Sequence, residues 1–488
     1  MSGLRLPGAS GAPLGFCWNG RRMTALAGDS VAQALLANGV RTLAWTRKAH
    51  RPMGLSGLYT TGVLARVDGV PNVRLDQCLV REGMQVQMQN CWPSPRFDLL
   101  RLARLVPSRW LRGGFEQTNL VPSGGRLFQH WEALLAFLAG VAAPASRGHD
   151  GPPPVGQRLR AEVLVIGAGP TGCAAANRAA EAGREVLLVS RGAAQARLAV
   201  QSGARLPRLD ERVRCAFGLD VFGAYREGRL LLAAPSDPSL PAVALEADEV
   251  ILATGRRVVP TLVPGAWLPG VMDARTALAL ASERRIAPGK AVVVVGDGLY
   301  KALANRLRQL GVHVVAVADV RDLRRVYGRR RVTGVLLDRL QRCDALVFDG
   351  PGLFDDSLSF QGAASGRLQL RGGSSAYRRA GSAAEADPEL PPPTDGDVLL
   401  CPCFDVCGHE VDDLLAQGID DLEVIKRLTS CGMGPCQGQP CWDSLRAYVA
   451  ARLGLPAGHL AKPTLRPPRR ALTVAQAAGL ADVVEPLR

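Results

Sequence analysis

The chain lacks any apolar stretch long enough to cross a membrane. Its 488 residues are 47% hydrophobic, yet no apolar run reaches the roughly 18–20 residues that a bilayer span requires. The longest candidate near the front, Ala133–Ala143, is too short. The first residues also lack the charged-then-apolar pattern of an export signal. We therefore expect a cytoplasmic protein that folds as several domains, since its length suits about two to four.

The sequence also lacks a side-chain set for acid–base or nucleophilic catalysis. Its six histidines are scattered along the chain, and the middle holds only the isolated cysteines Cys173, Cys215 and Cys343. A thioredoxin-reductase-like enzyme needs a Cys-x-x-Cys pair beside its flavin. That class of enzyme is therefore disfavoured, and we expect bound cofactors to supply the chemistry.

The formal net charge of +15 raises the question of nucleic-acid binding. Most of the arginines are spread through every segment, and one dense cluster comprises Arg324, Arg325, Arg329, Arg330 and Arg331. No nucleic-acid motif accompanies this cluster. The pattern favours a solvated surface, or a docking face for an acidic partner, over a nucleic-acid interface.

Six of the twelve cysteines fall between Cys401 and Cys441, which indicates a metal site in a chain with reduced thiols. Cys401 and Cys403 form a C-x-C pair, and Cys436 and Cys441 form a C-x4-C pair. Four thiolates on a small helical module suit a [2Fe–2S] cluster. Structural zinc is the alternative, but its usual spacing is C-x2–4-C. We interpret the other two cysteines, Cys407 and Cys431, as spare thiols, and the nearby His409 as a surface residue.

Two linker-like stretches, Ala145–Arg158 and Gly372–Asp397, are rich in small residues and proline. No solenoid-type repeat is present. We expect an α/β protein, and its predicted domains are an N-terminal domain at 1–95, a connector at 96–158, a dinucleotide-binding region at 159–371, a linker at 372–397, and a cluster domain with the C-terminal tail at 398–488.

The first nucleotide-binding signature follows the apolar strand Glu162–Ile166. Its residues are Gly167, Gly169, Pro170 and Gly172, and a helix-like run and a second strand come next. This order is the context of the Rossmann fingerprint, in which glycines let backbone N–H groups approach a pyrophosphate at the helix N-terminus. An acidic residue normally closes the second strand and binds the ribose. Here that place holds Ser190, followed by Arg191, so adenosine binding should be weaker.

A second pair of signatures lies further along the chain. Ala253-Thr254-Gly255 ends an apolar strand and resembles the second signature of two-dinucleotide-binding flavoproteins. A further βαβ-like unit, Ala291–Asp319, contains Gly296 and Gly298, but Lys301 replaces the third glycine, which should keep its helix further from the strand. Asp319 closes the second strand of this unit and is a candidate ribose ligand. Nicotinamide nucleotide binding and an empty structural repeat both remain open here.

Taken together, these residues resemble the α-type flavoprotein subunits of heteromeric amine and amino-acid oxidoreductases. The relatives are of the sarcosine oxidase α, octopine and nopaline oxidase, D-hydroxyproline dehydrogenase and hydrogen cyanide synthase types. The specific matches are the run Gly432-Met-Gly-Pro-Cys-Gln-Gly438 and the tail Arg466-Pro-Pro-Arg469. The resemblance implies a Rossmann-like two-dinucleotide-binding core, an N-terminal ferredoxin-like α+β domain, and a C-terminal helical [2Fe–2S] domain of bacterioferritin-associated-ferredoxin type.

The N-terminal resemblance rests on four short motifs: Asn19-Gly-Arg21, Gly28-Asp-Ser30, Ala34-Leu-Leu-Ala-Asn-Gly39 and Asp68-Gly-Val-Pro-Asn-Val-Arg74. Cluster-binding relatives place four cysteines around the last of these. An ungapped alignment puts Leu55, Thr60, Val63 and Asp76 at those four places. The resemblance therefore implies a domain without a cluster of its own, acting as a scaffold or docking surface, and Cys78 alone does not restore the site.

The family also returns to its flavin domain through a strand that ends in a Gly-Asp pair. No such segment is recognisable between Val347 and Cys401. This absence and Ser190 count against FAD, whereas the intact first fingerprint and Ala253-Thr254-Gly255 favour it.

The resemblance implies an oxidoreductase subunit that passes electrons through FAD and the [2Fe–2S] cluster, with NAD(P) as a further option at the second βαβ unit. The substrate would be an amino acid, opine or related secondary amine oxidised at its CH–NH bond. The implied partner is an amino-acid-oxidase-like β subunit, with room for a small ferredoxin-like subunit. The alternative is a degenerate scaffold that holds only the [2Fe–2S] cluster.

Overall fold

The computed structural model describes residues 3–105, 154–192, 207–363, 377–379 and 398–484, together with the single residues 130, 133, 195 and 393. Within these ranges, residues 47, 58–61, 96, 226–229, 236, 238–239, 299, 440, 471 and 482 are not described. The described residues fall into two compact units. Unit 1 draws on Met1–Ser146, Val258–Pro351 and Glu389–Pro463, and unit 2 on Arg147–Arg257, Gly352–Pro388 and Thr464–Arg488.

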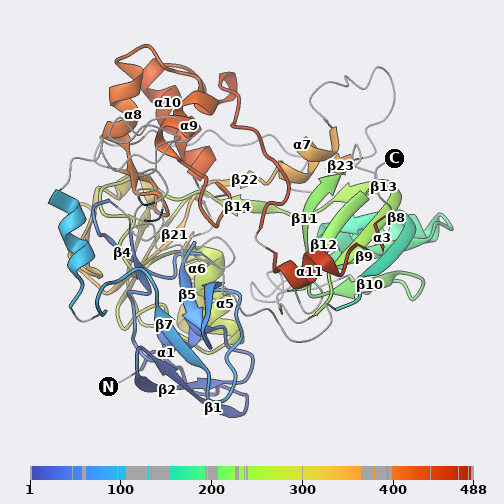
Figure 1. Ribbon diagram of the computed structural model, residues 1–488, viewed down its shortest axis with the longest axis horizontal. Helices are drawn as coiled ribbons and strands as arrows, with labels where there is room; N and C mark the ends of the chain where they lie inside the picture. Colours follow the sequence, from blue (N-terminus) through green and yellow to red (C-terminus); the bar gives the residue numbers. More distant parts are fainter. Residues whose placement is uncertain are drawn as a thin grey trace. The chain divides into compact units, whose positions relative to one another are not determined.

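The N-terminal part of unit 1 is a small α+β domain, as the resemblance implied (Figure 1). Its sheet has the order β2-β1-β7-β5-β6. The strands are β1 (Pro13–Trp18), β2 (Arg21–Leu26), β5 (Leu64–Val67), β6 (Val70–Arg74) and β7 (Gln85–Met88). Asn19 and Gly20, both at positive φ, make the tight turn between β1 and β2.

A single buried helix, α1 (Val31–Ala37), covers this domain's core. A reciprocal capping box between Ser30 and Gln33 satisfies the free N–H groups at its start. Two short strands, β3 (Ala44–Trp45) and β4 (Pro52–Met53), pair beside it, and the 3-10 helix η1 (Leu99–Leu105) follows.

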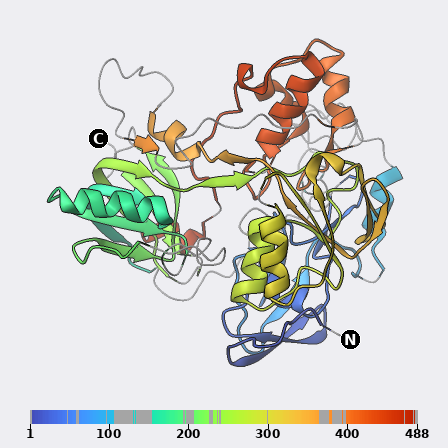
Figure 2. The same cartoon turned by 180° about the vertical axis from the view of Figure 1, so that it is seen from behind.

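The second part of unit 1 is a parallel sheet of order β15-β21-β16-β17. The strands are β15 (Val271–Asp273), β16 (Val292–Gly296), β17 (Val314–Asp319) and β21 (Ala345–Asp349). Helices α5 (Ala274–Glu283) and α6 (Tyr300–Gln309) pack side by side against it (Figure 2). Every residue of β16 is buried, as its unbroken valine run predicts for a central parallel strand. A three-stranded meander follows: β18 (Arg325–Gly328), β19 (Val332–Leu336) and β20 (Leu340–Arg342).

The third part of unit 1 is the cysteine-rich module, which is mainly helical. It contains β24 (Leu399–Cys401), β25 (Val406–Cys407), α8 (Gly408–Leu415), α9 (Leu422–Thr429), α10 (Cys441–Leu453) and η6 (Ala457–His459). Asp421 caps the start of α9, and Ser430 ends that helix in the left-handed conformation. The small helical module expected around the cysteine pairs is therefore confirmed.

Unit 2 is a Rossmann-like α/β fold with the sheet order β10-β9-β8-β13-β12-β11. Its strands are β8 (Gln157–Ile166), β9 (Val186–Ser190), β10 (Arg214–Phe217), β11 (Leu219–Tyr225), β12 (Leu230–Pro235) and β13 (Val243–Leu252). Strand β23 (Tyr377–Arg379) adds to β13. The helices are α3 (Pro170–Glu181), α7 (Ser357–Ala363) and α11 (Val474–Ala478). Strands β14 (Arg256–Val258) and β22 (Gly352–Phe354) pair with each other.

No helix in the described part of the chain has both the length and the apolar character that a membrane span requires.

Candidate flavin and iron–sulfur sites

The cysteine-rich module gathers its thiols in one buried core. Cys401 ends β24, Cys441 begins α10, and Cys436 lies in the loop before it. All three are at most 1% exposed. The Sγ atoms of Cys403 and Cys436 lie 3.6 Å apart. Two thiolates on one tetrahedral metal, with metal–sulfur bonds of about 2.3 Å, would lie roughly 3.8 Å apart. The two cysteine pairs that the sequence separates by 33 residues therefore meet.

The thiols interact directly with one another. Hydrogen bonds from Cys431 and Cys441 lower the pKa of Cys401 well below its ordinary value. Hydrogen bonds from Cys403 and Cys441 do the same for the pKa of Cys436. In the described residues, no three Cys, His, Asp or Glu side chains are arranged around the position of a single metal ion. The free thiols instead form a compact group whose members are hydrogen-bonded to one another.

Cys431, which its sequence spacing presents as a spare thiol, lies within this group in contact with Cys401. Its C-x4-C spacing from Cys436 is the same as that between Cys436 and Cys441, so spacing alone does not decide which of these thiols belong to the site. Cys407 lies apart, at the start of α8, where burial raises its pKa to about 11. His409 is exposed, as expected for a surface residue.

Glycines allow the loop before α10 to fold this tightly. A Cβ atom on Gly432 would lie 1.9 Å from Trp442 Nε1, and one on Gly438 would lie 2.2 Å from Trp442 Cε2. Both glycines also have positive φ. The Gly432 N–H donates to Cys401 Sγ over 3.4 Å. The loop backbone thus donates directly to a cysteine sulfur at this residue.

The N-terminal domain has other side chains where its relatives carry cluster cysteines. Leu55 and Val63 are buried in the apolar core, and Asp76 is paired with Arg74 over 2.6 Å. Thr60, the fourth position, lies outside the described residues. None of these side chains supplies the thiolate that the cluster chemistry needs.

Unit 2 builds the first nucleotide fingerprint in the predicted strand–turn–helix order. Gly167 has φ +110°, and an added Cβ there would lie 2.3 Å from the Ala253 carbonyl oxygen. A Cβ on Gly172 would lie 1.8 Å from the Gly167 carbonyl oxygen. Gly169 caps α3 with open space around it, and Pro170 starts the helix. The turn therefore leads into a helix N-terminus, where the first backbone N–H groups have no partner within the helix, as pyrophosphate binding requires.

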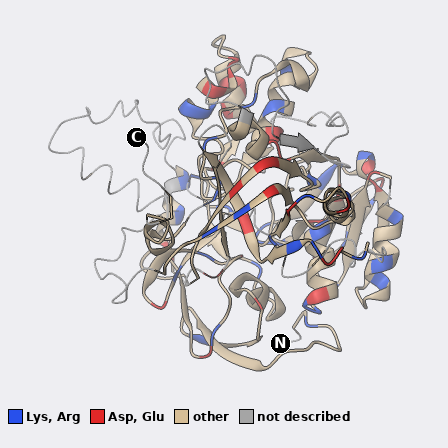
Figure 3. Ribbon diagram, turned by 90° about the vertical axis from the view of Figure 1, so that its right-hand side faces the viewer, with Lys and Arg blue, Asp and Glu red and all other residues tan. Residues whose placement is uncertain are grey.

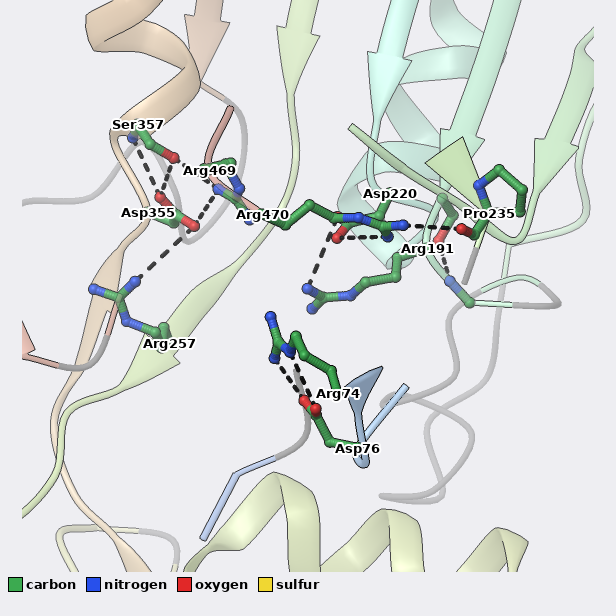
Figure 4. Close-up of polar contacts among 12 residues, drawn as sticks. Arg74, Asp76, Arg191, Asp220, Pro235, Arg257, Asp355, Ser357, Arg469 and Arg470 are labelled. Atoms are coloured by element: carbon green, nitrogen blue, oxygen red, sulfur yellow. Dashed lines mark hydrogen bonds and ion pairs between the residues drawn. The ribbon is translucent and has the colours of Figure 1, made fainter. Parts of the chain in front are cut away.

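Strand β9 ends at Ser190, so the acidic ribose ligand is absent from that position. The Ser190 hydroxyl accepts a hydrogen bond from the Gly192 N–H over 3.3 Å. Arg191 reaches toward Asp220, 4.0 Å away, and Asp220 also pairs with Arg470 over 3.6 Å (Figure 4). The end of β9 is therefore polar, with arginine as its charged group.

Strand β13 is directly followed by Ala253, Thr254 and Gly255. The Ala253 N–H donates a hydrogen bond to the Ile166 carbonyl at the end of β8. This contact brings the second signature against the first fingerprint. The return strand that the sequence does not reveal is present as β23, which pairs in parallel with β13. The segment Tyr377–Arg379 is too short and too polar to be recognised as a strand from its sequence. The residues that follow, Ala380-Gly381-Ser382, contain no Gly-Asp pair and lie outside the described residues.

Within unit 2, the carboxylate of Asp355 binds the tail Arg466-Pro-Pro-Arg469 through an ion pair with Arg469. Asp355 pairs with Arg469, lies 4.0 Å from Arg257, and accepts a 2.6 Å hydrogen bond from Ser357 (Figure 4). Burial would raise the pKa of Asp355, but Arg469 and Arg257 hold it well below its ordinary value. The carboxylate is therefore a charged anchor for the tail.

The second βαβ unit keeps its shape, but its ribose candidate is already paired. Arg321 donates to both oxygens of Asp319 at 2.9 Å, and this hydrogen bonding lowers the pKa of Asp319 to about 2. The expectation for Lys301 was wrong, because its side chain is exposed and Tyr300 lies next to Gly296. A Cβ on Gly296 would approach Tyr300 Cβ to 2.5 Å.

Basic residues occur on many elements of the chain (Figure 3). The arginine cluster lies on and beside the meander β18–β20, where all five of its members are exposed. Within the described residues, none of the five takes part in an ion pair, and Arg330 lies over the Trp45 ring at 5.9 Å. The expected solvated surface is thus in place, and the nature of its partner stays a prediction.

Comparisons with known proteins match this architecture in order along the chain. A 2Fe-2S iron-sulfur cluster binding domain matches residues 11–91. A pyridine nucleotide-disulphide oxidoreductase domain matches residues 161–342, and a sarcosine oxidase A3 domain matches residues 400–480. The cofactors that these domains indicate are FAD and a [2Fe–2S] cluster. The N-terminal residues that the first domain matches carry none of the four expected cluster cysteines, so the described thiols of the C-terminal module are the candidate ligands. The fold and sites thus define a flavin- and iron–sulfur-dependent oxidoreductase.

Curated relatives agree with this class. The sarcosine oxidase alpha chain of Rhizobium meliloti is 33% identical over 66% of this chain and 36% of its own length. An opine oxidase subunit of the same organism is 34% identical over 21% of each chain. Hydrogen cyanide synthase subunit HcnB of Pseudomonas protegens is 26% identical over 30% of each. The matches thus span about a third or less of these relatives. The chain is similar to the α-type subunits that these proteins represent over the parts that match.

The fold also agrees with a solved structure. The crystal structure of L-proline dehydrogenase from P. horikoshii matches with a TM-score of 0.73 over 98% of this chain and 99% of that one, at 20% sequence identity. At this identity the match shows a shared fold.

Proposed function

We propose that the chain is the electron-transferring subunit of a heteromeric dehydrogenase or oxidase that acts on the CH–NH bond of an amino acid, opine or related secondary amine. In this function Cys401, Cys403, Cys436 and Cys441 hold a [2Fe–2S] cluster. The observation that carries the proposal is the 3.6 Å approach of Cys403 Sγ to Cys436 Sγ inside a buried thiol group. Buried thiols that are hydrogen-bonded to one another can be deprotonated together when a metal cluster replaces their protons.

In this proposal unit 2 holds FAD along the glycine turn Gly167–Gly172 and the Ala253–Gly255 segment. Bound flavin would supply the exchange of electrons between the substrate side and the cluster. The turn fits a pyrophosphate because its backbone N–H groups are open, and Ser190 with Arg191 would contact the adenosine end. The protein's part is to bind the pyrophosphate on α3 and to keep the neighbouring β13 backbone close. We leave NAD(P) at Gly296 and Gly298 as a lesser option because Asp319 already pairs with Arg321.

The partner in this proposal is an amino-acid-oxidase-like β subunit, which would carry the amine pocket. A small ferredoxin-like subunit fits the same assembly. Two lines of support are the relatives named as subunits of sarcosine and opine oxidases and the absence of an acid–base side-chain set in this sequence. A cytoplasmic location belongs to the proposal, since reduced thiols are needed to build the cluster.

The test is co-expression of the chain with a candidate amino-acid-oxidase-like β subunit, followed by anaerobic purification. A visible spectrum is recorded before and after heat denaturation and centrifugation. We expect flavin bands in the supernatant and, before heating, a broad iron–sulfur absorption that dithionite bleaches. Iron–sulfur absorption without released flavin would contradict the FAD assignment and support a scaffold that holds one cluster. Zinc without iron would contradict the cluster itself.

A further inference from the structure

The N-terminal domain binds the cysteine-rich module through the buried carboxylate of Asp405, which belongs to that module. Asp405 lies two residues after Cys403, and its side chain is fully buried. It accepts hydrogen bonds of 2.6 Å from the Thr46 hydroxyl and from the Ala49 N–H, and it pairs with Arg51. A buried carboxylate with this many donors is stable only while all of them stay in place. The turn that carries Cys403 is therefore held by the loop between β3 and β4.

A second buried ion pair joins the same two parts of unit 1. Lys48 Nζ lies 2.7 Å and 3.0 Å from the two carboxylate oxygens of Glu410, and both side chains are at most 9% exposed. Glu410 also accepts from the Cys407 N–H at the start of α8. Separating the two parts would leave an unpaired charge on each side, which is strongly unfavourable in an apolar interior.

The N-terminal domain also contacts a candidate cluster ligand directly. A Cβ atom on Gly62 would lie 2.3 Å from Cys403 Sγ and 3.7 Å from Pro435 Cδ. The Gly62 backbone therefore lies against the thiol group, and only glycine leaves room for the sulfur. Gly62 immediately precedes Val63, one of the positions where cluster-binding relatives of this domain are expected to carry a cysteine.

The buried ion pair of Arg74 and Asp76, 2.6 Å apart, lies beside this contact. Arg74 pairs with Leu64 across β5 and β6, and the next residue, Leu75, donates its N–H to the carbonyl of Val63, which follows Gly62. Burial would lower the pKa of Arg74, but Asp76 and the nearby Cys436 and Cys403 raise it. Burial raises the pKa of Asp76, Arg74 lowers it, and Cys436 raises it further. These charge interactions act through an interior from which water is excluded, so each is stronger than on the surface.

We propose that the N-terminal domain, which has no cluster cysteines of its own, forms the outer wall of the neighbouring cluster site and that its Arg74 and Asp76 set the reduction potential of that cluster. This inference rests on the proposed [2Fe–2S] function. Gly62 closes the wall against Cys403, and Asp405 and Glu410 hold it in position. Reduction adds a negative charge to the cluster, so a nearby cation favours the reduced form and a nearby anion disfavours it.

The contact is tested with Gly62→Ala in the full chain, with Gly458→Ala as the matched control, since a Cβ at Gly458 meets no atom within 4 Å. We expect Gly62→Ala to lower the iron and sulfide content or to change the electron paramagnetic resonance spectrum of the reduced cluster, while Gly458→Ala matches the wild type. A wild-type spectrum and iron content in Gly62→Ala would contradict the proposal that the N-terminal domain forms a wall of the cluster site.

The electrostatic role is tested with two near-isosteric changes and a redox titration followed by electron paramagnetic resonance. We expect Arg74→Gln to lower the midpoint potential of the cluster and Asp76→Asn to raise it. Simple loosening of the site would move both variants in the same direction, so shifts of equal sign, or no shift, would overturn the assignment. If Gly62→Ala does not fold, this titration alone decides the inference.

The wild-type protein separates this inference from the proposed function. Wild-type protein without iron after anaerobic reconstitution would refute the cluster and, with it, the wall. Wild-type protein with a [2Fe–2S] spectrum, combined with unaffected variants, would refute only the wall.

Discussion

At the scale of single residues, the sulfur atoms carry the assignment of the cysteine-rich module. Cys403 is the member of the group whose neighbours are best defined, since Cys436 lies 3.6 Å away and the Gly434 backbone packs on it. A serine at this position keeps the side-chain size but is a poor ligand for iron.

We therefore expect Cys403→Ser to lose most of its iron and its visible cluster absorption, with iron content measured per chain. Cys215→Ser is the matched control, because Cys215 is exposed and lies in unit 2 instead of in the cysteine-rich module. Full iron content in Cys403→Ser would remove this residue from the ligand set and direct attention to Cys431.

The pair Asp355 and Arg469 is a second single-residue feature with a measurable effect. Removing one partner of a fully buried ion pair costs about 3–5 kcal/mol. Asp355 is 19% exposed, and we therefore expect Arg469→Met to lower the free energy of unfolding by roughly 2–3 kcal/mol. Arg208→Met, at a 91% exposed position, should change it by less than about 0.5 kcal/mol. Chemical denaturation measures both.

The same carboxylate predicts a pH dependence. The pKa of Asp355 is lower in the folded protein than in the unfolded chain, where it is near 4. Its contribution is present in full above that value and is lost as the pH falls through the folded pKa. Asp355→Asn should therefore flatten the fall in unfolding free energy below about pH 4. An unchanged slope in denaturation curves between pH 3 and pH 5 would contradict the ion pair.

At the scale of elements, the turn between β8 and α3 depends on two close backbone approaches. A Cβ on Gly172 would lie 1.8 Å from the Gly167 carbonyl oxygen, so Gly172→Ala must push α3 away from the sheet. Overpacking of this kind typically costs about 1–3 kcal/mol.

For Gly172→Ala we expect a lower melting temperature and less flavin released on heating. Gly458→Ala, which meets nothing within 4 Å, should leave both unchanged. A variant with wild-type flavin content would show that α3 does not contact the cofactor.

Some helices, strands and turns could be predicted from the sequence, and others could not. The strand–turn–helix order around Gly167 and the two helices between the cysteine pairs were predictable, because each depends on spacing within about twenty residues. Strand β23 was missed, since three polar residues have no apolar pattern and gain strand structure only by pairing with β13. Lys301 was misjudged because its side chain is exposed, and Tyr300 is the residue that lies next to Gly296.

At the scale of the whole molecule, the net charge of +15 governs behaviour in solution. The triple change of Arg329, Arg330 and Arg331 to alanine should lower the salt concentration at which the protein elutes from a cation exchanger. Melting temperature should stay within error, because these side chains are exposed.

The matched control for this prediction replaces Arg208, Arg212 and Arg214, which lose the same charge but each lie in an ion pair. A larger elution shift in the control than in the Arg329–Arg331 variant would contradict a concentrated basic surface on the meander.

The sequence by itself determined the local chemistry: the glycine turn that fits a pyrophosphate, the C-x-C and C-x4-C thiols, and Ser190 in place of an acidic ribose ligand. These follow from residue type and short spacing, which set backbone geometry directly. Only the tertiary structure decided that Cys431 contacts Cys401, that the tail from Thr464 packs within unit 2, and that Asp405 is held by Thr46 and Arg51. Such contacts join residues far apart in the chain, and they form because buried charges and strand edges require partners that only the folded chain provides.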